Sequence, residues 1–177
     1  MSSNRKQLVL KPQDLLVLLK IACTRDQIFT YAALGGQIGI SASEAHSCVK
    51  RAEAARLAVH EDGVNMSVLR SALTEFVIHG AKYAFPSSMG SVTRGMPTAY
   101  AAAPLRELIN QADDIPPVWP DPNGLVRGVA ITPLYHSVPF AASADPKLYE
   151  CLALFDALRS GAAREREKAE ELLLARL

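Results

Sequence analysis

Polar side chains that could contact nucleic acid are concentrated between residues 30 and 56 of this 177-residue chain. At about 100° per residue, one face of a helix over 43–56 carries hydroxyl, imidazole and ammonium groups, with a guanidinium on its flank. Lysine can donate to guanine O6 or N7, whereas serine and histidine can bond base edges or phosphates. The expected contact residues on this helix are Ser43, His46, Ser47, Lys50 and Arg51. Two more are expected at the start of the preceding helix, Thr30 and Tyr31.

Two short helices joined by a tight turn are expected to position this face. Thr30 can cap the first helix through its hydroxyl, and Gly39 fits a turn that favours a positive φ. Gly35 provides a small residue where the two helices approach most closely. Ser41 and Glu44 have the spacing of a capping box, in which the hydroxyl accepts an amide N–H and the carboxylate reaches back to the cap. The segment therefore predicts a helix-turn-helix, a device that places its second helix in the major groove of DNA.

Flanking segments supply the remaining elements of this N-terminal part. Residues 11–24 carry leucines at helical spacing behind an early proline and predict a first helix. After the third helix, two short apolar stretches around an Asp-Gly turn at 62–63 predict a minimal β-hairpin. A capping residue at 65 or 67 then predicts a fourth helix over roughly 67–84.

The pattern L-G-x-x-I-G-I-S-x-x-E-A-x-x-x-V-K-R-A over residues 34–52 resembles the helix-turn-helix of bacterial winged-helix regulators, the MarR-like group in particular. The resemblance covers roughly residues 11–66. It implies that helix 43–56 docks in the major groove and that the hairpin, the wing of that group, touches the DNA backbone. Gly36 within the second helix and the very short hairpin depart from the pattern.

Residues 86–145 change character, because they hold nine of the eleven prolines. This density excludes long helices, whereas an apolar run at 125–134 argues against low complexity. We expect an ordered, irregular segment with one or two short strands over the helical core. Within it, Arg94 lies in a glycine-containing loop and is the expected contact for an anionic ligand or a phosphate. The loop lacks the Gly-Lys-Ser/Thr ending of a P-loop, so nucleotide hydrolysis is not expected.

Residues 146–177 are expected to form the C-terminal helices. Asp145 and Pro146 are the capping acid and first-turn proline of a helix start, and apolar residues follow at spacings of three and four. A charged helix with leucines near its end completes the chain. Helix-turn-helix proteins usually bind two half-sites, so we expect this part to form a homodimer or to hold a protein partner. The alternative is that it folds back onto the fourth helix.

Composition limits the remaining classes. The net charge is only +1, and no run approaches the about 20 apolar residues of a membrane span. Three scattered cysteines predict neither a disulfide framework nor a zinc site, and favour a reducing cytoplasm. Cys23 and Cys48 are expected to fill the core, with redox sensing as the alternative. Without a catalytic constellation or metal-ligand spacing, we expect no enzyme activity, no catalytic residues, no metal and no cofactor.

The sequence thus predicts a mainly α protein in three parts: a winged-helix-like helix-turn-helix domain with a fourth helix (1–85), a Pro-rich irregular segment (86–145) and C-terminal helices (146–177). The expected function is sequence-specific transcriptional regulation by a cytoplasmic homodimer that reads double-stranded DNA. One alternative is a protein-interaction module of the same fold, such as an antitoxin-like or adaptor partner of a neighbouring gene product. A third hypothesis is a ligand-sensing regulator with a pocket near Arg94 and Trp119.

Overall fold

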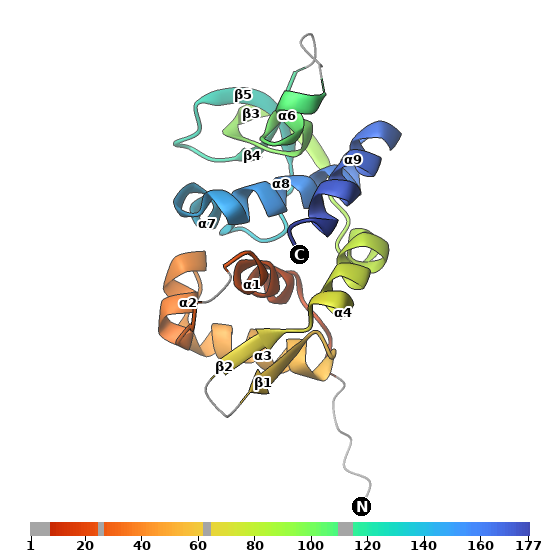
Figure 1. Cartoon of the computed structure of the whole chain (residues 1–177). Coiled ribbons are helices and arrows are strands. Elements are labelled where there is room, and N and C mark those ends of the chain that lie inside the picture. Colours follow the sequence, from red (N-terminus) through yellow and green to blue (C-terminus); the bar gives the residue numbers. More distant parts are fainter. Residues whose placement is uncertain (1–7, 25–26, 62–64, 110–114) are drawn as a thin grey trace, which may run out of the picture.

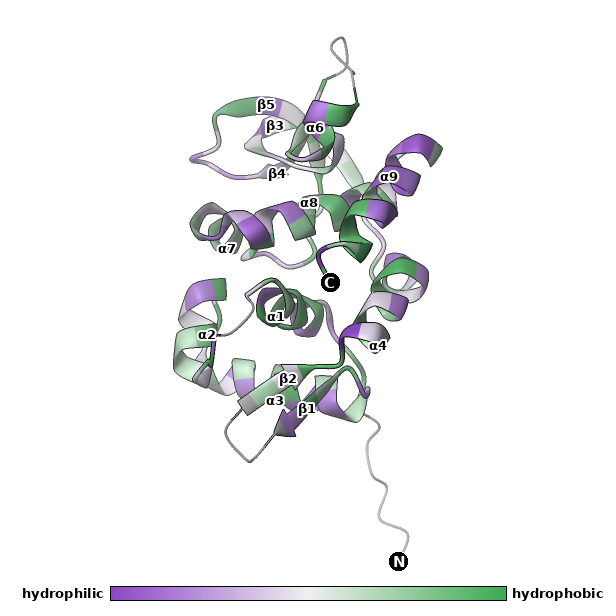
Figure 2. Ribbon diagram, in the orientation of Figure 1, coloured by the Kyte–Doolittle hydropathy of each residue, from purple (hydrophilic) through white to green (hydrophobic). Residues whose placement is uncertain are grey.

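The computed structural model describes residues 8–24, 27–61, 65–109 and 115–177. Near its centre lies helix α1 (Pro12–Cys23), whose sequence is apolar on nearly every side. A helix without a polar face is stable only when it is covered, and α1 is buried from Asp14 to Cys23. Figure 2 shows this apolar helix with other elements on both sides of it.

The next elements agree with the sequence expectation. Helices α2 (Tyr31–Ile38) and α3 (Ala42–Ala54) are joined by a tight turn. Strands β1 (Ala58–Glu61) and β2 (Asn65–Val68) pair antiparallel, and α3 and β2 both pack against α1. The turn expected at Asp62-Gly63 lies outside the described residues.

The fourth helix begins later than expected and contains a π-helical segment. Strand β2 continues through Val68, so α4 (Arg70–Glu75) begins beyond the expected start at residue 67. The chain then runs through η1 (Phe76–Ala81) into the short α5 (Lys82–Ala84). Leu73 and Val77 of this segment are buried in the core.

The expectation of a mainly α, winged-helix-like fold is wrong, because the Pro-rich segment forms a closed three-stranded barrel. Strand β3 (Met89–Pro97) pairs antiparallel with both β4 (Pro117–Pro120) and β5 (Val126–Ile131), and β4 and β5 run parallel. Between β3 and β4 lie a 3₁₀ turn, η2 (Ala99–Ala101), and the short helix α6 (Leu105–Leu108). The described chain is therefore a mixed α/β protein.

Prolines do not prevent this barrel because they lie at the ends of strands. One proline ends β3, and two others begin and end β4, where a missing N–H leaves the ladder intact. Glycines allow the strands to close tightly. A Cβ on Gly95 would lie 2.1 Å from the carbonyl oxygen of Trp119, and one on Gly128 would lie 2.0 Å from that of Pro116.

Helices α7 (Val138–Ala144), α8 (Pro146–Ser160) and α9 (Ala163–Leu174) follow the barrel. The buried residues of α8 run from Leu148 to Leu158, and α8 packs against α1, α7 and α9. The apolar side of α8 is therefore covered by the chain itself, whereas Leu174 of α9 is exposed. Residues from both ends of the chain share one continuous core.

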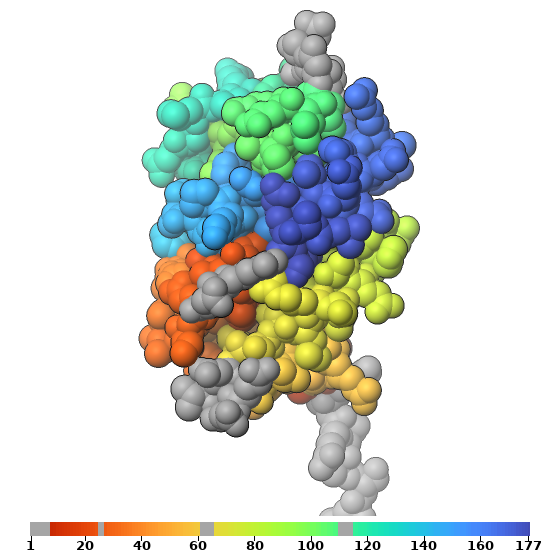
Figure 3. Space-filling model, in the orientation of Figure 1, coloured from red at the N-terminus to blue at the C-terminus, as the bar shows by residue number. Residues whose placement is uncertain are grey.

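These elements stack in layers along the molecule. In Figure 1, α3 and the hairpin lie at one end, followed by α1 with α2 beside it, then α7 to α9, with the barrel at the other end. Figure 3 shows the same order as bands of colour. The carboxylate of Asp156 links α8 to the barrel, because it accepts hydrogen bonds from the Thr98 hydroxyl at 2.8 Å and from the Trp119 indole N–H at 2.5 Å. No helix in the described part of the chain is long and apolar enough to cross a membrane.

Candidate nucleic-acid interface

The turn between α2 and α3 is determined by two glycines and one cap. Gly39 has a φ of +73°, in the left-handed region that favours glycine. A Cβ on Gly35 would lie 2.6 Å from the carbonyl oxygen of Ile40, so the chain can pass this closely only over a glycine. The Ser41 hydroxyl accepts the N–H of Glu44 at 3.1 Å and caps α3. These contacts agree with the predicted turn and hold the two helices at a defined angle.

The second half of the expected capping box is not formed. Glu44 instead accepts hydrogen bonds from Arg51 Nη2 at 2.7 Å and from Gln13 at 3.2 Å. Arg51 also binds Asp14 of α1, and only 11% of its side chain is exposed. Arg51 was expected on the flank of the exposed face, but it points toward α1, and Asp14 and Glu44 hold its guanidinium. Its partner Asp14 lies 37 residues earlier, where helical spacing could not reveal it.

Helix α3 has one covered face and one open face. Ala45, Cys48, Val49 and Ala52 are buried, and the burial of Cys48 agrees with its expected place in the core. The open face presents Ser43, His46 and Lys50 as exposed residues and Ser47 as a half-buried one. At the start of α2, the exposed Thr30 caps the helix by accepting the N–H of Ala33 at 3.1 Å. Four of the expected contact residues thus share one surface on α3.

A chain of polar contacts links this surface to α2 and β1. Lys50 Nζ donates to Glu53 Oε2 at 3.1 Å, and the other Glu53 oxygen pairs with His60 Nδ1. His60 Nε2 lies 3.1 Å from the Tyr31 hydroxyl, and the Tyr31 ring meets the His46 ring edge-on at 5.0 Å. The structure thereby gathers three expected site residues around two, Glu53 and His60, that the sequence reasoning missed.

The sequence held a signal for one of these two residues. Glu53 follows Lys50 by three positions, a spacing at which opposite charges meet on a helix. Burial raises the pKa of Glu53, but hydrogen bonds from His60 and Lys50 outweigh burial and leave the pKa below its ordinary value. The carboxylate is therefore ionised at neutral pH, and a phosphate that binds Lys50 must compete with it. His60 has no comparable signal, because only the fold brings β1 beside α2.

Arg94 lies on the barrel, at the opposite end of the molecule from α3 (Figure 1). It pairs across the strands with Arg127, and both side chains are exposed. Neither guanidinium forms an ion pair with any residue that the structure describes. Like charges at directly opposed positions repel, so an anion bound between them would relieve this repulsion.

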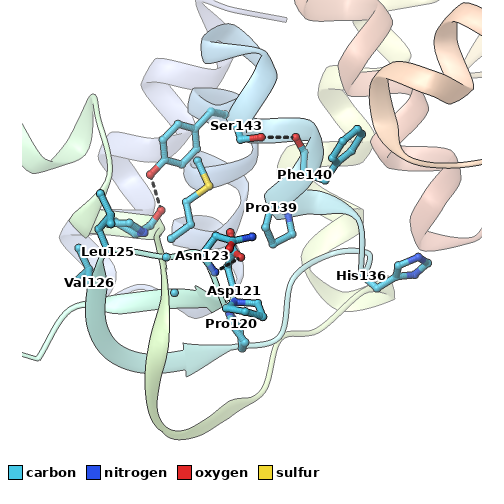
Figure 4. Close-up of a pocket in the computed structure, with 15 residues that line it drawn as sticks. Pro120, Asp121, Asn123, Leu125, Val126, His136, Pro139, Phe140 and Ser143 are labelled. Carbon is cyan, nitrogen blue, oxygen red and sulfur yellow. Dashed lines mark hydrogen bonds between the residues drawn. The ribbon is translucent and has the colours of Figure 1, made fainter.

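A cavity of about 690 Å³ lies between the barrel and helices α7 and α8 (Figure 4). Its lining is mostly apolar, with a few polar groups: Leu125, Val126, Pro139 and Phe140 beside Asp121, Asn123, His136 and Ser143. This volume and composition suit a small organic molecule. The cavity lies near Arg94 and Trp119, since their neighbours Gly95 and Pro120 line it, whereas Arg94 and the fully buried Trp119 do not.

The α7 wall of this cavity touches the turn between α2 and α3. The Ser137 hydroxyl donates to the carbonyl of Ile38 at 2.6 Å. A Cβ on Gly39 would lie 3.1 Å from the ring of Phe140, which lines the cavity. A movement of α7 would therefore shift the turn that orients α3.

The described residues show no metal site. Within residues 8–24, 27–61, 65–109 and 115–177, no group of three or more His, Cys, Asp and Glu residues is arranged to hold a metal ion. No known protein family, curated protein or solved structure matches the chain. The geometry of the α2–α3 surface is accordingly the main basis for a function.

Proposed function

We propose that this protein is a sequence-specific DNA-binding transcriptional regulator that reads the major groove with α3. The observation that carries the proposal is the open face of α3, where Ser43, His46 and Lys50 are exposed beside a turn held by Gly35 and Gly39. An α-helix fits the major groove, and these side chains can bond base edges and phosphates. The resemblance of residues 34–52 to MarR-like regulators supports the same proposal.

The electrostatics of this face suggest modest affinity for a single copy. Lys50 is held by Glu53, and the chain has a net charge of only +1. Proteins of this kind commonly gain affinity by binding two half-sites as symmetric dimers. We therefore include a homodimer in the proposal. Its contact surface would differ from the apolar side of α8, which is buried within the chain.

A titration on the DNA upstream of the protein's own gene, at several salt concentrations, tests the proposal. Lys50→Ala should weaken binding and reduce the slope of log affinity against log salt by about one. Lys168→Ala is a matched control, because Lys168 on α9 forms the same i,i+3 pair with a glutamate, Glu171. His46→Ala should reduce the preference for specific over random DNA.

Two results would contradict DNA reading by α3. One is an equal loss of affinity for the Lys50 and Lys168 variants. The other is the absence of binding near physiological salt together with a stable complex with a neighbouring gene product. That second result would favour a protein-interaction module. Light scattering of the free protein and of its DNA complex tests the homodimer separately.

A specific observation favours control of the same surface by a small molecule. Phe140 lines the 690 Å³ cavity and packs beside Gly39 of the α2–α3 turn, and Ser137, between the lining residues His136 and Pro139, donates to the carbonyl of Ile38. Compounds that raise the melting temperature of the protein should therefore change its DNA affinity, and Phe140→Ala should weaken this coupling. Compounds that bind in the cavity and leave DNA affinity unchanged would contradict ligand control.

A further inference from the structure

Two cysteines from opposite ends of the sequence meet in the core. The sulfurs of Cys23 and Cys151 lie 2.7 Å apart, although 128 residues separate them in the chain. Both cysteines are in the free thiol form. Cys23 ends α1, whereas Cys151 lies in the first half of α8. The contact was not foreseen from the sequence, which placed both Cys23 and Cys48 in the core without a partner.

The two helices hold these sulfurs in position. Helices α1 and α8 pack directly against each other. Lys20, one turn before Cys23, also donates to Asp145 at the start of α8 at 2.6 Å. The thiols are therefore presented to each other by two rigid, packed elements and not by a loop.

A cavity of about 320 Å³ connects this pair with the surface. Its lining includes both cysteines, together with Lys147, Glu150 and Arg176. Cys23 is 8% exposed and Cys151 only 1% exposed. A small reagent that enters the cavity therefore reaches the Cys23 sulfur first.

We propose that Cys23 and Cys151 are a modification site, at which they form a reversible disulfide by exchange with a low-molecular-weight disulfide. The Cys23 thiol loses its proton to solvent, and its thiolate attacks one sulfur of the reagent. The S–S bond of the reagent breaks, a mixed disulfide forms on Cys23, and the first small thiolate leaves and takes up a proton. The Cys151 thiol then loses its proton to solvent, and its thiolate attacks Cys23 Sγ, which breaks the mixed disulfide and releases the second small thiolate to be protonated in turn. In total, two protein thiols and one small disulfide give one protein disulfide and two small thiols.

The surroundings of Cys151 suit its role as the second, resolving thiol. Its hydrogen bond with Cys23 is the largest cause that raises the pKa of Cys151, followed by burial. Both causes favour the neutral thiol of Cys151, so Cys23, the more exposed of the two, is the thiol that reacts first.

The disulfide would join α1 to α8, which lie in adjacent layers at the centre of the molecule (Figure 1). Such a cross-link restricts the unfolded chain strongly because it closes a long loop. Oxidation should therefore raise the melting temperature, and a reductant should reverse the rise. This inference does not depend on the proposed function, since it concerns the α1–α8 contact alone.

The test uses the full chain under native conditions with oxidised glutathione as the probe. The intact mass of the wild-type protein should fall by two hydrogen atoms, and peptide mapping should identify a Cys23–Cys151 link. Cys48→Ala is the matched control, because Cys48 is also buried but contacts Glu44 and Arg51. This variant should form the disulfide as the wild type does. Cys151→Ala should stop at a glutathione adduct on Cys23, and Cys23→Ala should remain largely unmodified.

The peptide map of the wild-type protein tests for the Cys23–Cys151 disulfide even if a cysteine variant fails to fold. A link that involves Cys48, or a link between two chains, would overturn the proposal. So would an unchanged mass under native conditions when the same protein, unfolded in urea, reacts readily.

Discussion

Arg51 of α3 and Asp14 of α1 form a bidentate ion pair in the core of the protein. Arg51 Nε lies 2.8 Å from Asp14 Oδ2, and Nη2 lies 2.7 Å from Oδ1. Asp14 is fully buried, and Glu44 also accepts a hydrogen bond from the same guanidinium. The pair therefore positions α3, the helix proposed to read DNA, on the central helix.

Arg51→Met should lower the free energy of unfolding by about 3–5 kcal/mol, because it leaves the buried Asp14 carboxylate without its counter-charge. The double variant Asp14→Leu with Arg51→Met should recover most of this loss, since it removes both buried charges. Urea denaturation of the three proteins measures both effects. A single variant as stable as the wild type would contradict this role for the pair.

Two adjacent glycines in α2 should respond in opposite directions to alanine. Gly35→Ala should destabilise the protein by about 1–3 kcal/mol, because its Cβ would lie 2.6 Å from the backbone oxygen of Ile40. Gly36→Ala should stabilise it by about 0.5–1 kcal/mol, since a Cβ there meets nothing within 4 Å and alanine favours the helix. Thermal or urea unfolding provides the comparison. A Gly35→Ala variant as stable as the Gly36→Ala variant would show that position 35 tolerates a side chain, which would contradict this prediction.

Glu53→Gln should strengthen DNA binding if α3 reads DNA as proposed. The change releases Lys50 from its 3.1 Å ion pair and removes a negative charge beside the expected phosphate. We expect a gain of about two- to fivefold in affinity, equivalent to roughly 0.4–1 kcal/mol. Glu171→Gln, which releases Lys168 on α9, serves as the control in the same DNA titration. Weaker binding by the Glu53 variant would place the DNA elsewhere.

Acid should weaken the fold partly through Asp145, which caps α8 and pairs with Lys20. Burial raises the pKa of Asp145, but hydrogen bonds from Lys20 and the α8 backbone outweigh burial and lower the pKa below its ordinary value. A carboxyl with a lowered folded pKa stabilises the protein fully above the unfolded pKa of about 4. This stability is lost as the pH falls through the folded pKa.

Urea denaturation from about pH 6 to about pH 2 measures this loss. Lys20→Met should reduce the acid-dependent part, because it removes the side chain that contributes most to the lowered pKa. Asp145→Asn keeps a capping side chain and removes the titration, so it should flatten the same profile. An unchanged profile in both variants would exclude Asp145 as a source of acid sensitivity.

Local features of the N-terminal part could be predicted because they depend on neighbouring residues. The cap at Thr30, the left-handed Gly39 and the buried face of α3 follow from steric and hydrogen-bonding rules within a few positions. The open face with His46 and Lys50 follows from the same periodicity.

The barrel could not be predicted in the same way. Its strands pair residues that lie far apart, such as Arg94 with Arg127, and proline content indicated only that long helices were excluded. Whether a proline interrupts a strand or ends it depends on register, and the barrel determines the register. Gly95 and Gly128 allow neighbouring strands to approach closely, but only the folded barrel shows which strands do so.

The sequence alone determined the α2–turn–α3 unit and the residues on its outer face, because helical periodicity and capping are local properties. Only the tertiary structure decided that Arg51 points to Asp14, that Glu53 and His60 join the candidate site and that Cys23 meets Cys151. It also decided that the apolar surface of α8 is covered by its own chain. These contacts form when packing of a shared core brings distant segments together, and no spacing within one segment encodes them.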